Sequence, residues 1–219
     1  MSTSRSVLTL LKPWLPLAAA ALATGLVVSA QTSDTEPAPQ NVEGGHSGNI
    51  IGKVTAGRGI SAVWVEAADG QTYPKPDKPL AISQKALRFV PHVLVVPVGA
   101  TVEFLNGDTV QHNIFWPAIS GNKKLGHTLG TWPQGQKRAF QFTTAGVVPL
   151  LCNVHPEMSA YLIVTPTPYR AETDESGSFK IANVPDGSYK VTAWHEGFKS
   201  LSKPVTVASD AKVDFTLVK

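Results

Sequence analysis

The stretch Cys152-Asn153-Val154-His155-Pro156-Glu157-Met158 places a thiol, an imidazole and a thioether close together in the chain. Cys152 is the only cysteine of the sequence, and Met158 is the only methionine besides Met1. These soft ligands suit copper, and a second imidazole, His112, stands on an earlier segment with the pattern of a strand. The four side chains predict a type 1 copper site with His112, Cys152 and His155 as equatorial ligands and Met158 as the weak axial one.

A simpler interpretation needs no metal. It makes Cys152 a buried free thiol, the histidine a surface residue and the methionine a core residue that are neighbours by chance. That interpretation fits each residue taken alone. It does not explain why all four ligands of a copper site occur at a workable spacing.

The rest of the sequence predicts an all-β protein. Its 219 residues, 42% of them hydrophobic, are enough for one large or two small domains. Glycine and proline are frequent, and no stretch outside the N-terminus has sustained helical periodicity. We expect a long loop at residues 117–136 and strands at residues 49–55, 61–67, 89–98, 101–105, 111–116, 138–143, 147–152, 160–165, 203–207 and 213–218.

Residues 81–166 resemble the cupredoxin family. The resemblance rests on Phe89-Val90-Pro91, the segments 93–108 and 146–164, and His112-Asn113. The Cys-x2-His-x2-Met spacing is similar to the short ligand loop of amicyanin rather than the longer loop of plastocyanin. The resemblance implies a Greek-key β-sandwich or barrel that binds one copper ion and transfers single electrons. It also implies that the backbone amide of Asn113 donates to the thiolate.

The same resemblance implies where electrons enter and leave. The histidine between the cysteine and the methionine reaches the surface in this family, so His155 is the expected electron port. Pro156 is a candidate for an apolar docking patch around it. Trp116 and Trp132 either contribute to that patch or only pack the end of the barrel. The expected partner is a redox protein such as a cytochrome or a dehydrogenase, bound weakly and transiently.

The C-terminal third has another character. The run from Thr173 to Val191, with its Thr-Asp turn, resembles the carboxypeptidase regulatory-like domain, a small prealbumin-like β-sandwich. The opening strands of such a domain are matched far upstream, by Gly52-Lys53-Val54 and by residues 62–65. We therefore expect a sandwich made of residues 49–80 and 167–219, with the copper module inserted. The alternative is that residues 49–70 are the first strands of an extended cupredoxin.

The N-terminus predicts export. Residues 1–30 carry Arg5 and Lys12 ahead of an apolar run and end in Ala30, as a signal peptide does. An uncleaved anchor is the alternative, and it is the one route by which the sequence predicts a membrane association. Residues 31–48 are expected to form a flexible linker. A periplasmic or otherwise exported location follows, and metal ligation would protect the lone thiol there.

Composition and motifs exclude other classes. Without residues 1–30 the chain has 17 basic and 16 acidic residues, a balance that gives no case for nucleic-acid binding. The sequence has no paired carboxylates at motif spacing, phosphate-cradling loop or nucleophile–base pattern, so we do not expect an enzyme. His92, His127 and His195 are isolated and are expected on the surface or in loops. Copper handling without redox traffic, and adhesion through a sandwich with a vestigial metal site, remain alternatives.

Overall fold

The computed structural model describes residues 46–67 and 71–219. The predicted signal peptide and nearly all of the predicted linker lie outside these residues. The described part consists of β-strands and one short 3-10 helix, η1 (Lys123–Leu125), which confirms the all-β fold class. No helix of the described part is long and apolar enough to cross a membrane.

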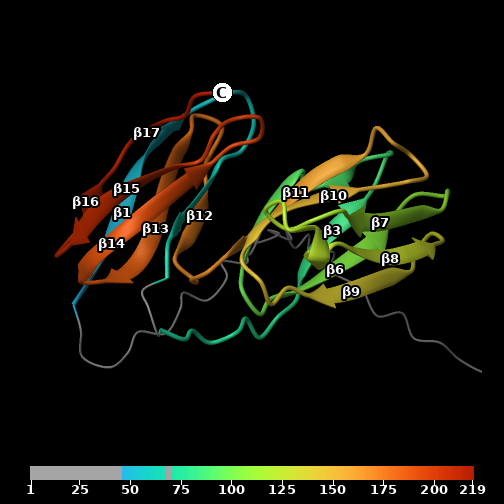
Figure 1. Ribbon diagram of the computed structural model, residues 1–219, viewed down its shortest axis with the longest axis horizontal. Helices are drawn as coiled ribbons and strands as arrows, with labels where there is room; N and C mark the ends of the chain where they lie inside the picture. Colours follow the sequence, from blue (N-terminus) through green and yellow to red (C-terminus); the bar gives the residue numbers. More distant parts are fainter. Residues whose placement is uncertain (1–45, 68–70) are drawn as a thin grey trace, which may run out of the picture. The chain divides into compact units, whose positions relative to one another are not determined.

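Residues 80–165 form one sandwich, which we call the central sandwich (Figure 1). One sheet has the strand order β5-β11-β10-β7-β8, and the other has the order β4-β3-β6-β9. Its strands are β3 (Leu80–Gln84), β4 (Phe89–Val90), β5 (Val93–Pro97), β6 (Thr101–Asn106), β7 (His112–Trp116), β8 (His127–Trp132), β9 (Lys137–Gln141), β10 (Gly146–Leu151) and β11 (Ser159–Thr165).

Alternation of buried and exposed side chains explains why these segments form strands. Along β6, Val102, Phe104 and Asn106 point inward while their neighbours are more exposed. Val102 and Phe104 join a core cluster that includes Leu150 and Leu162. Each fully buried side chain of this kind contributes about 1.5 to 3 kcal/mol by leaving water. The polar Asn106 is the exception in this row, and it lies at the end of the strand where the site is found.

The central sandwich corrects three sequence expectations. The strand expected at residues 89–98 is divided into β4 and β5, which lie in different sheets. The predicted loop at 117–136 contains β8, which pairs antiparallel with β7. Its sequence lacks strand alternation because β8 lies at the edge of its sheet and its side chains are mostly exposed. β3 was also missed, because three prolines precede it and only five residues form the strand. It nevertheless lies inside its sheet, between β4 and β6.

The remaining strands form a second sandwich from two distant segments, which we call the two-segment sandwich. One sheet has the order β13-β1-β16, with β17 also pairing with β1, and the other has the order β12-β2-β14-β15. In Figure 1 the blue β1 lies among orange and red strands from the end of the chain. The strands are β1 (Ser47–Thr55), β2 (Ala62–Val65), β12 (Arg170–Glu172), β13 (Ser178–Pro185), β14 (Gly187–Trp194), β15 (Leu201–Val207), β16 (Ala211–Lys212) and β17 (Phe215–Thr216).

Close packing ties β1 to the C-terminal strands. Ile50 and Val54 on β1 share a buried cluster with Ile181 and Phe215. A β-carbon at Gly52 would lie 1.8 Å from the carbonyl oxygen of Val213, so only glycine fits there. The early Gly-x-Val segment thus packs against the C-terminal strands.

Candidate metal centre

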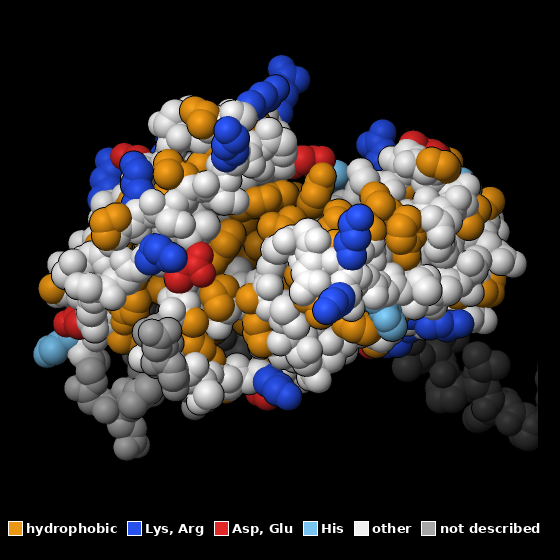
Figure 2. Space-filling view, viewed as in Figure 1, with side chains coloured by type: hydrophobic (Ala, Val, Ile, Leu, Met, Phe, Trp, Pro, Cys, Tyr) orange, Lys and Arg blue, Asp and Glu red, His pale blue; other side chains and the backbone are white. Residues whose placement is uncertain are grey.

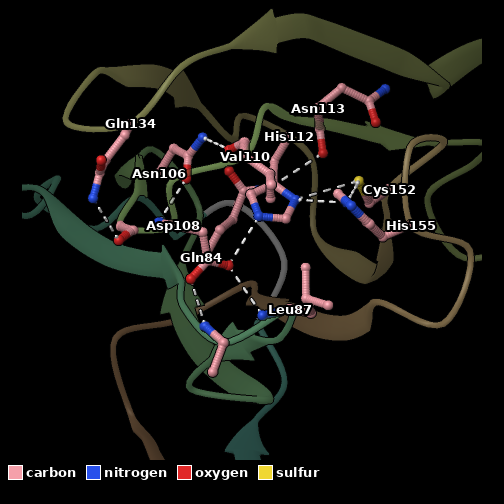
Figure 3. A network of polar contacts seen from close by, with 12 residues as sticks. Gln84, Leu87, Asn106, Asp108, Val110, His112, Asn113, Gln134, Cys152 and His155 are labelled. Atoms are coloured by element: carbon pink, nitrogen blue, oxygen red, sulfur yellow. Dashed lines mark hydrogen bonds and ion pairs between the residues drawn. The ribbon is translucent and has the colours of Figure 1, made fainter.

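Three side chains from separate parts of the central sandwich meet at one end of it. His112 is the first residue of β7, Cys152 directly follows β10, and His155 lies in the loop that leads to β11. The two Nδ1 atoms are 3.0 Å apart, and Cys152 Sγ is 3.9 Å from His112 Nδ1 and 4.0 Å from His155 Nδ1. Figure 3 shows the three groups facing one another. Among the described residues, this is the one group of three or more His, Cys, Asp or Glu side chains close enough to hold a metal ion.

These separations fit a single ion. Bonds of about 2.0 Å to nitrogen and 2.3 Å to sulfur around one centre put the ligand atoms about 3 to 4 Å apart. A thiolate with two imidazoles is a soft donor set that suits copper. His112 and Cys152 are buried, with 0% and 3% of their surface exposed, whereas His155 is half-buried. The arrangement can therefore hold a copper ion away from bulk water while one imidazole reaches the surface.

The loop that carries Cys152 and His155 is held at both ends. The amide of Asn153 donates to Oδ1 of Asn113 on β7, over 2.7 Å, which ties the loop to the strand of the other ligand. The amide of Met158 donates to the carbonyl oxygen of His155, which closes a turn. Met158 itself is 1% exposed and belongs to the same core cluster as Cys152. The axial role of Met158 stays a prediction. The hydrogen bond from the backbone amide of Asn113 to the thiolate of Cys152 also stays a prediction.

A carboxylate fixes the orientation of the first histidine, a contact that sequence reasoning missed. His112 Nε2 lies 2.9 Å from Oδ2 of Asp108. An ionised carboxylate can only accept, so Nε2 carries the proton and Nδ1 keeps its lone pair for a metal. Burial raises the pKa of Asp108, but bonds from the amides of Leu87 and Ala86 and from His112 outweigh it and leave the pKa below its usual value. No sequence signal marked this contact, because a four-residue spacing brings two side chains together only in a helix.

Buried amide side chains surround the ligands. Gln84 Nε2 donates to the carbonyl oxygen of Asn113, and Asn106 Nδ2 donates to the carbonyl oxygens of Val110 and Trp132. Asn106 Oδ1 accepts from the amide of Asp108. Gln84 and Asn106 are fully buried, so these bonds fix the backbone on which the ligands stand.

The predicted docking residues divide into two kinds. Pro156 is exposed beside His155. Trp116 and Trp132 are 1% and 0% exposed, so they offer no docking surface, and the alternative that they pack the sandwich agrees with the structure. Trp116 packs against Phe140 and Phe142 inside the sandwich, and Trp132 is paired opposite His112 across β7 and β8. Large aromatic side chains gain more by filling the core than by facing water.

The other histidines lie away from this cluster. His92 and His127 are exposed, as expected. His195 lies in the loop after β14, as expected, but it is only 3% exposed, and its Nδ1 lies 2.9 Å from the hydroxyl of Ser61. That hydrogen bond satisfies a buried imidazole without a metal.

Comparisons with known proteins bear on both sandwiches. The model of the carboxypeptidase regulatory-like domain family matches residues 158–218. No curated protein matches the chain. A copper-containing nitrite reductase from Thermus scotoductus SA-01 is similar to 45% of this chain, with 26% identity and a TM-score of 0.37, and the chain spans 25% of that protein's length.

Two reduced amicyanin variants are also similar. One is 24% identical with a TM-score of 0.36, over 45% of this chain and 86% of its own. The other is 23% identical with a TM-score of 0.37, over 46% of this chain and 90% of its own. As predicted, the chain is similar both to cupredoxins and, at residues 158–218, to the carboxypeptidase regulatory-like domain family.

Proposed function

We propose that this chain is an exported type 1 copper protein that carries single electrons between redox partners and is not an enzyme. The observation that supports this most is the convergence of Cys152 Sγ with the Nδ1 atoms of His112 and His155. A copper ion in such a site supplies a one-electron couple. Met158, buried next to the loop, is the proposed axial ligand.

The surroundings of the ligands fit this role. His112 is held by Asp108, and the ligand loop is tied to Asn113, so the ligand positions are set by the protein. Fixed ligand positions keep rearrangement between the two oxidation states small, which favours fast electron exchange. His155 is half-buried and Pro156 next to it is exposed. A partner that contacts these residues would therefore lie close enough to the copper ligands for electron transfer.

The test is the visible spectrum of the purified protein with one equivalent of Cu(II). The thiolate of Cys152 is expected to give an intense charge-transfer band at about 600 nm. Cys152→Ser removes the thiolate and should abolish the band. His195→Gln is the matched control, because it alters a buried histidine that has a structural partner in the other sandwich. A colourless, tetragonal copper complex of the wild type would contradict the proposal.

We further propose a partner with an acidic rim around an apolar centre. Exposed apolar side chains adjoin the site: Val154 next to His155, Val110 next to Gln111 and His112, and Leu87 beside Asp108. Lys85 and Arg88 are exposed on either side of Leu87, while Glu157 is an exposed acid of the ligand loop. Figure 2 shows Lys and Arg side chains set among exposed hydrophobic ones. A basic rim steers acidic partners toward the port.

Small redox reagents test the charge of this surface. Oxidation of the Cu(I) protein by the hexacyanoferrate(III) anion should slow several-fold in Lys85→Glu/Arg88→Glu at low salt, and the difference should shrink at high salt. Lys190→Glu/Lys199→Glu makes the same charge change in the two-segment sandwich and should have less effect. Equal effects of both pairs would contradict the placement of the electron port at His155. A blue protein that exchanges no electron with the reagent would favour copper handling without redox traffic.

A further inference from the structure

The turn between β3 and β4 has an unusual backbone. Ala86 and Leu87 both have left-handed conformations, with φ of 53° and 57°. Lys85 and Arg88 close the turn with hydrogen bonds in both directions between their amides and carbonyls, 2.9 and 3.2 Å long. Two-residue hairpin turns of this kind normally carry Asn and Gly, because a β-carbon crowds the backbone there. Something else must hold Ala86 and Leu87 in this shape.

The side chain of Asp108 provides that support. Its Oδ1 accepts from the amide of Ala86 over 2.6 Å, and its Oδ2 accepts from the amide of Leu87 over 3.0 Å. The same Oδ2 accepts from His112 Nε2 over 2.9 Å. Figure 3 shows the carboxylate between the turn and the imidazole. One carboxylate therefore joins a strained surface turn to a buried imidazole that faces the ligand cluster.

The groups joined by Asp108 range from buried to exposed. The side chain of Asp108 is 15% exposed and that of His112 is 0% exposed. Leu87 is 41% exposed, at the tip of the turn. Two hydrogen bonds through Asp108 Oδ2 therefore connect the exposed turn to the buried His112.

We propose that Asp108 is a positioning residue, which aims His112 Nδ1 at the metal and favours Cu(II) over Cu(I), and that the Ala86–Leu87 turn holds it in place. The negative charge of the Asp108 carboxylate, hydrogen-bonded to Nε2, makes the imidazole a stronger electron donor. It thereby stabilises Cu(II), the more highly charged ion. This inference rests on the proposed copper function and extends it to a residue outside the ligand set.

Two substitutions separate charge from position. Asp108→Asn removes the charge. Its single amide oxygen, at the position of Oδ2, still accepts from Leu87 and His112, whereas the bond from the Ala86 amide is lost. The ratio of the Cu(II) to the Cu(I) dissociation constant, measured by competition with chelators, should rise about tenfold, and the reduction potential should rise with it. Asp108→Ala also frees the ring, so Cu(II) affinity should fall by about 10- to 100-fold and the electron paramagnetic resonance spectrum should change.

The metal-free protein gives a readout that does not depend on copper. The Nε2 proton of His112 should exchange slowly in the wild type and in Asp108→Asn, and its NMR signal should be lost in Asp108→Ala. Asp174→Asn is the matched control, because it makes the same change in a carboxylate that holds a turn of the two-segment sandwich. Its copper affinities and potential should equal those of the wild type.

The outcomes separate this inference from the proposed function. If the wild type is blue and Asp108→Ala keeps wild-type affinities, potential and imidazole signal, the inference is wrong and the copper function stands. If the wild type forms no type 1 site, both are wrong. If Asp174→Asn shifts the potential as much as Asp108→Asn does, the shift does not come from the carboxylate beside His112, which also overturns the inference.

Discussion

Both sandwiches bury polar side chains that bond to the backbone, but among the described residues the central sandwich alone also brings metal-binding atoms together. In the two-segment sandwich, buried hydroxyls and the buried histidine bond to backbone or to one another: Thr167 Oγ1 donates to the carbonyl of Val65, and Ser61 meets His195. In the central sandwich, the donor atoms of three side chains face a common point. Buried polar groups that satisfy one another hold a fold together, whereas donor atoms that converge mark a site for a ligand.

The two regions also differ in how the chain builds them. The central sandwich is continuous in sequence, from β3 to β11. In the two-segment sandwich, β1 is the central strand of one sheet and β2 lies between β12 and β14 in the other. Removing the early segment therefore takes an inner strand from each sheet and leaves apolar faces uncovered.

Separate fragments should give the largest effect and would test this difference directly. A fragment of residues 79–166 should fold and bind copper, because it holds every strand and ligand of the central sandwich. A fragment of residues 167–219 should be unfolded, since it lacks β1 and β2. Circular dichroism and amide NMR dispersion measure both. Addition of a peptide of residues 46–67 should restore structure to the C-terminal fragment, and a well-folded fragment without that peptide would contradict the expected dependence.

Matched core substitutions should give the next largest effect. Ile50 on β1 and Ile82 on β3 are both 0% exposed. Replacing either with alanine should lower the free energy of unfolding of its own sandwich by about 2 to 5 kcal/mol. Ile82 stands two residues before Gln84, which bonds to Asn113, so Ile82→Ala should also alter the copper spectrum. Ile50→Ala should leave it unchanged.

Denaturant titrations followed by the copper band and by circular dichroism check this pair. A change of the copper band in Ile50→Ala as large as that in Ile82→Ala would show that the site depends on both cores. The two sandwiches would then not be independent in stability.

The ligand set could be predicted from sequence because its information is local and chemical. Cys152, His155 and Met158 lie in one loop, and few metals suit a thiol, an imidazole and a thioether together. The strands β6 and β10 could also be predicted, because apolar residues alternate along each strand and form its buried face. These features depend on short stretches of chain.

The parts that sequence could not give depend on pairing between distant segments. Trp132 resembled a surface aromatic in a glycine-rich loop, but pairing of β8 with β7 buries it opposite His112. His195 resembled a lone polar residue until packing placed Ser61 beside it. Asp108 has no motif of its own, and its role follows only from the left-handed turn that meets it. Burial and partners of single polar residues are properties of the tertiary structure.

The smallest effect concerns a turn of the two-segment sandwich that takes no part in the copper site. Asp174 Oδ1 accepts from the hydroxyl and the amide of Ser176 and from the amide of Ser178, at 2.7 to 2.9 Å. The Ser176 hydroxyl, followed by the Ser178 amide, holds the pKa of Asp174 below its usual value. Because the folded state binds the proton less tightly than the unfolded state, the stabilisation is present above the unfolded pKa of about 3.9 and is lost as pH falls through the folded pKa. Asp174→Asn should therefore lower the Tm of the metal-free protein at pH 7 and have less effect at pH 3, with Ser176→Ala giving part of the same change. A Tm difference equal at both pH values would show that the charge of Asp174 does not stabilise the turn. The carboxylate would then matter in the central sandwich, at Asp108, but not in the two-segment sandwich.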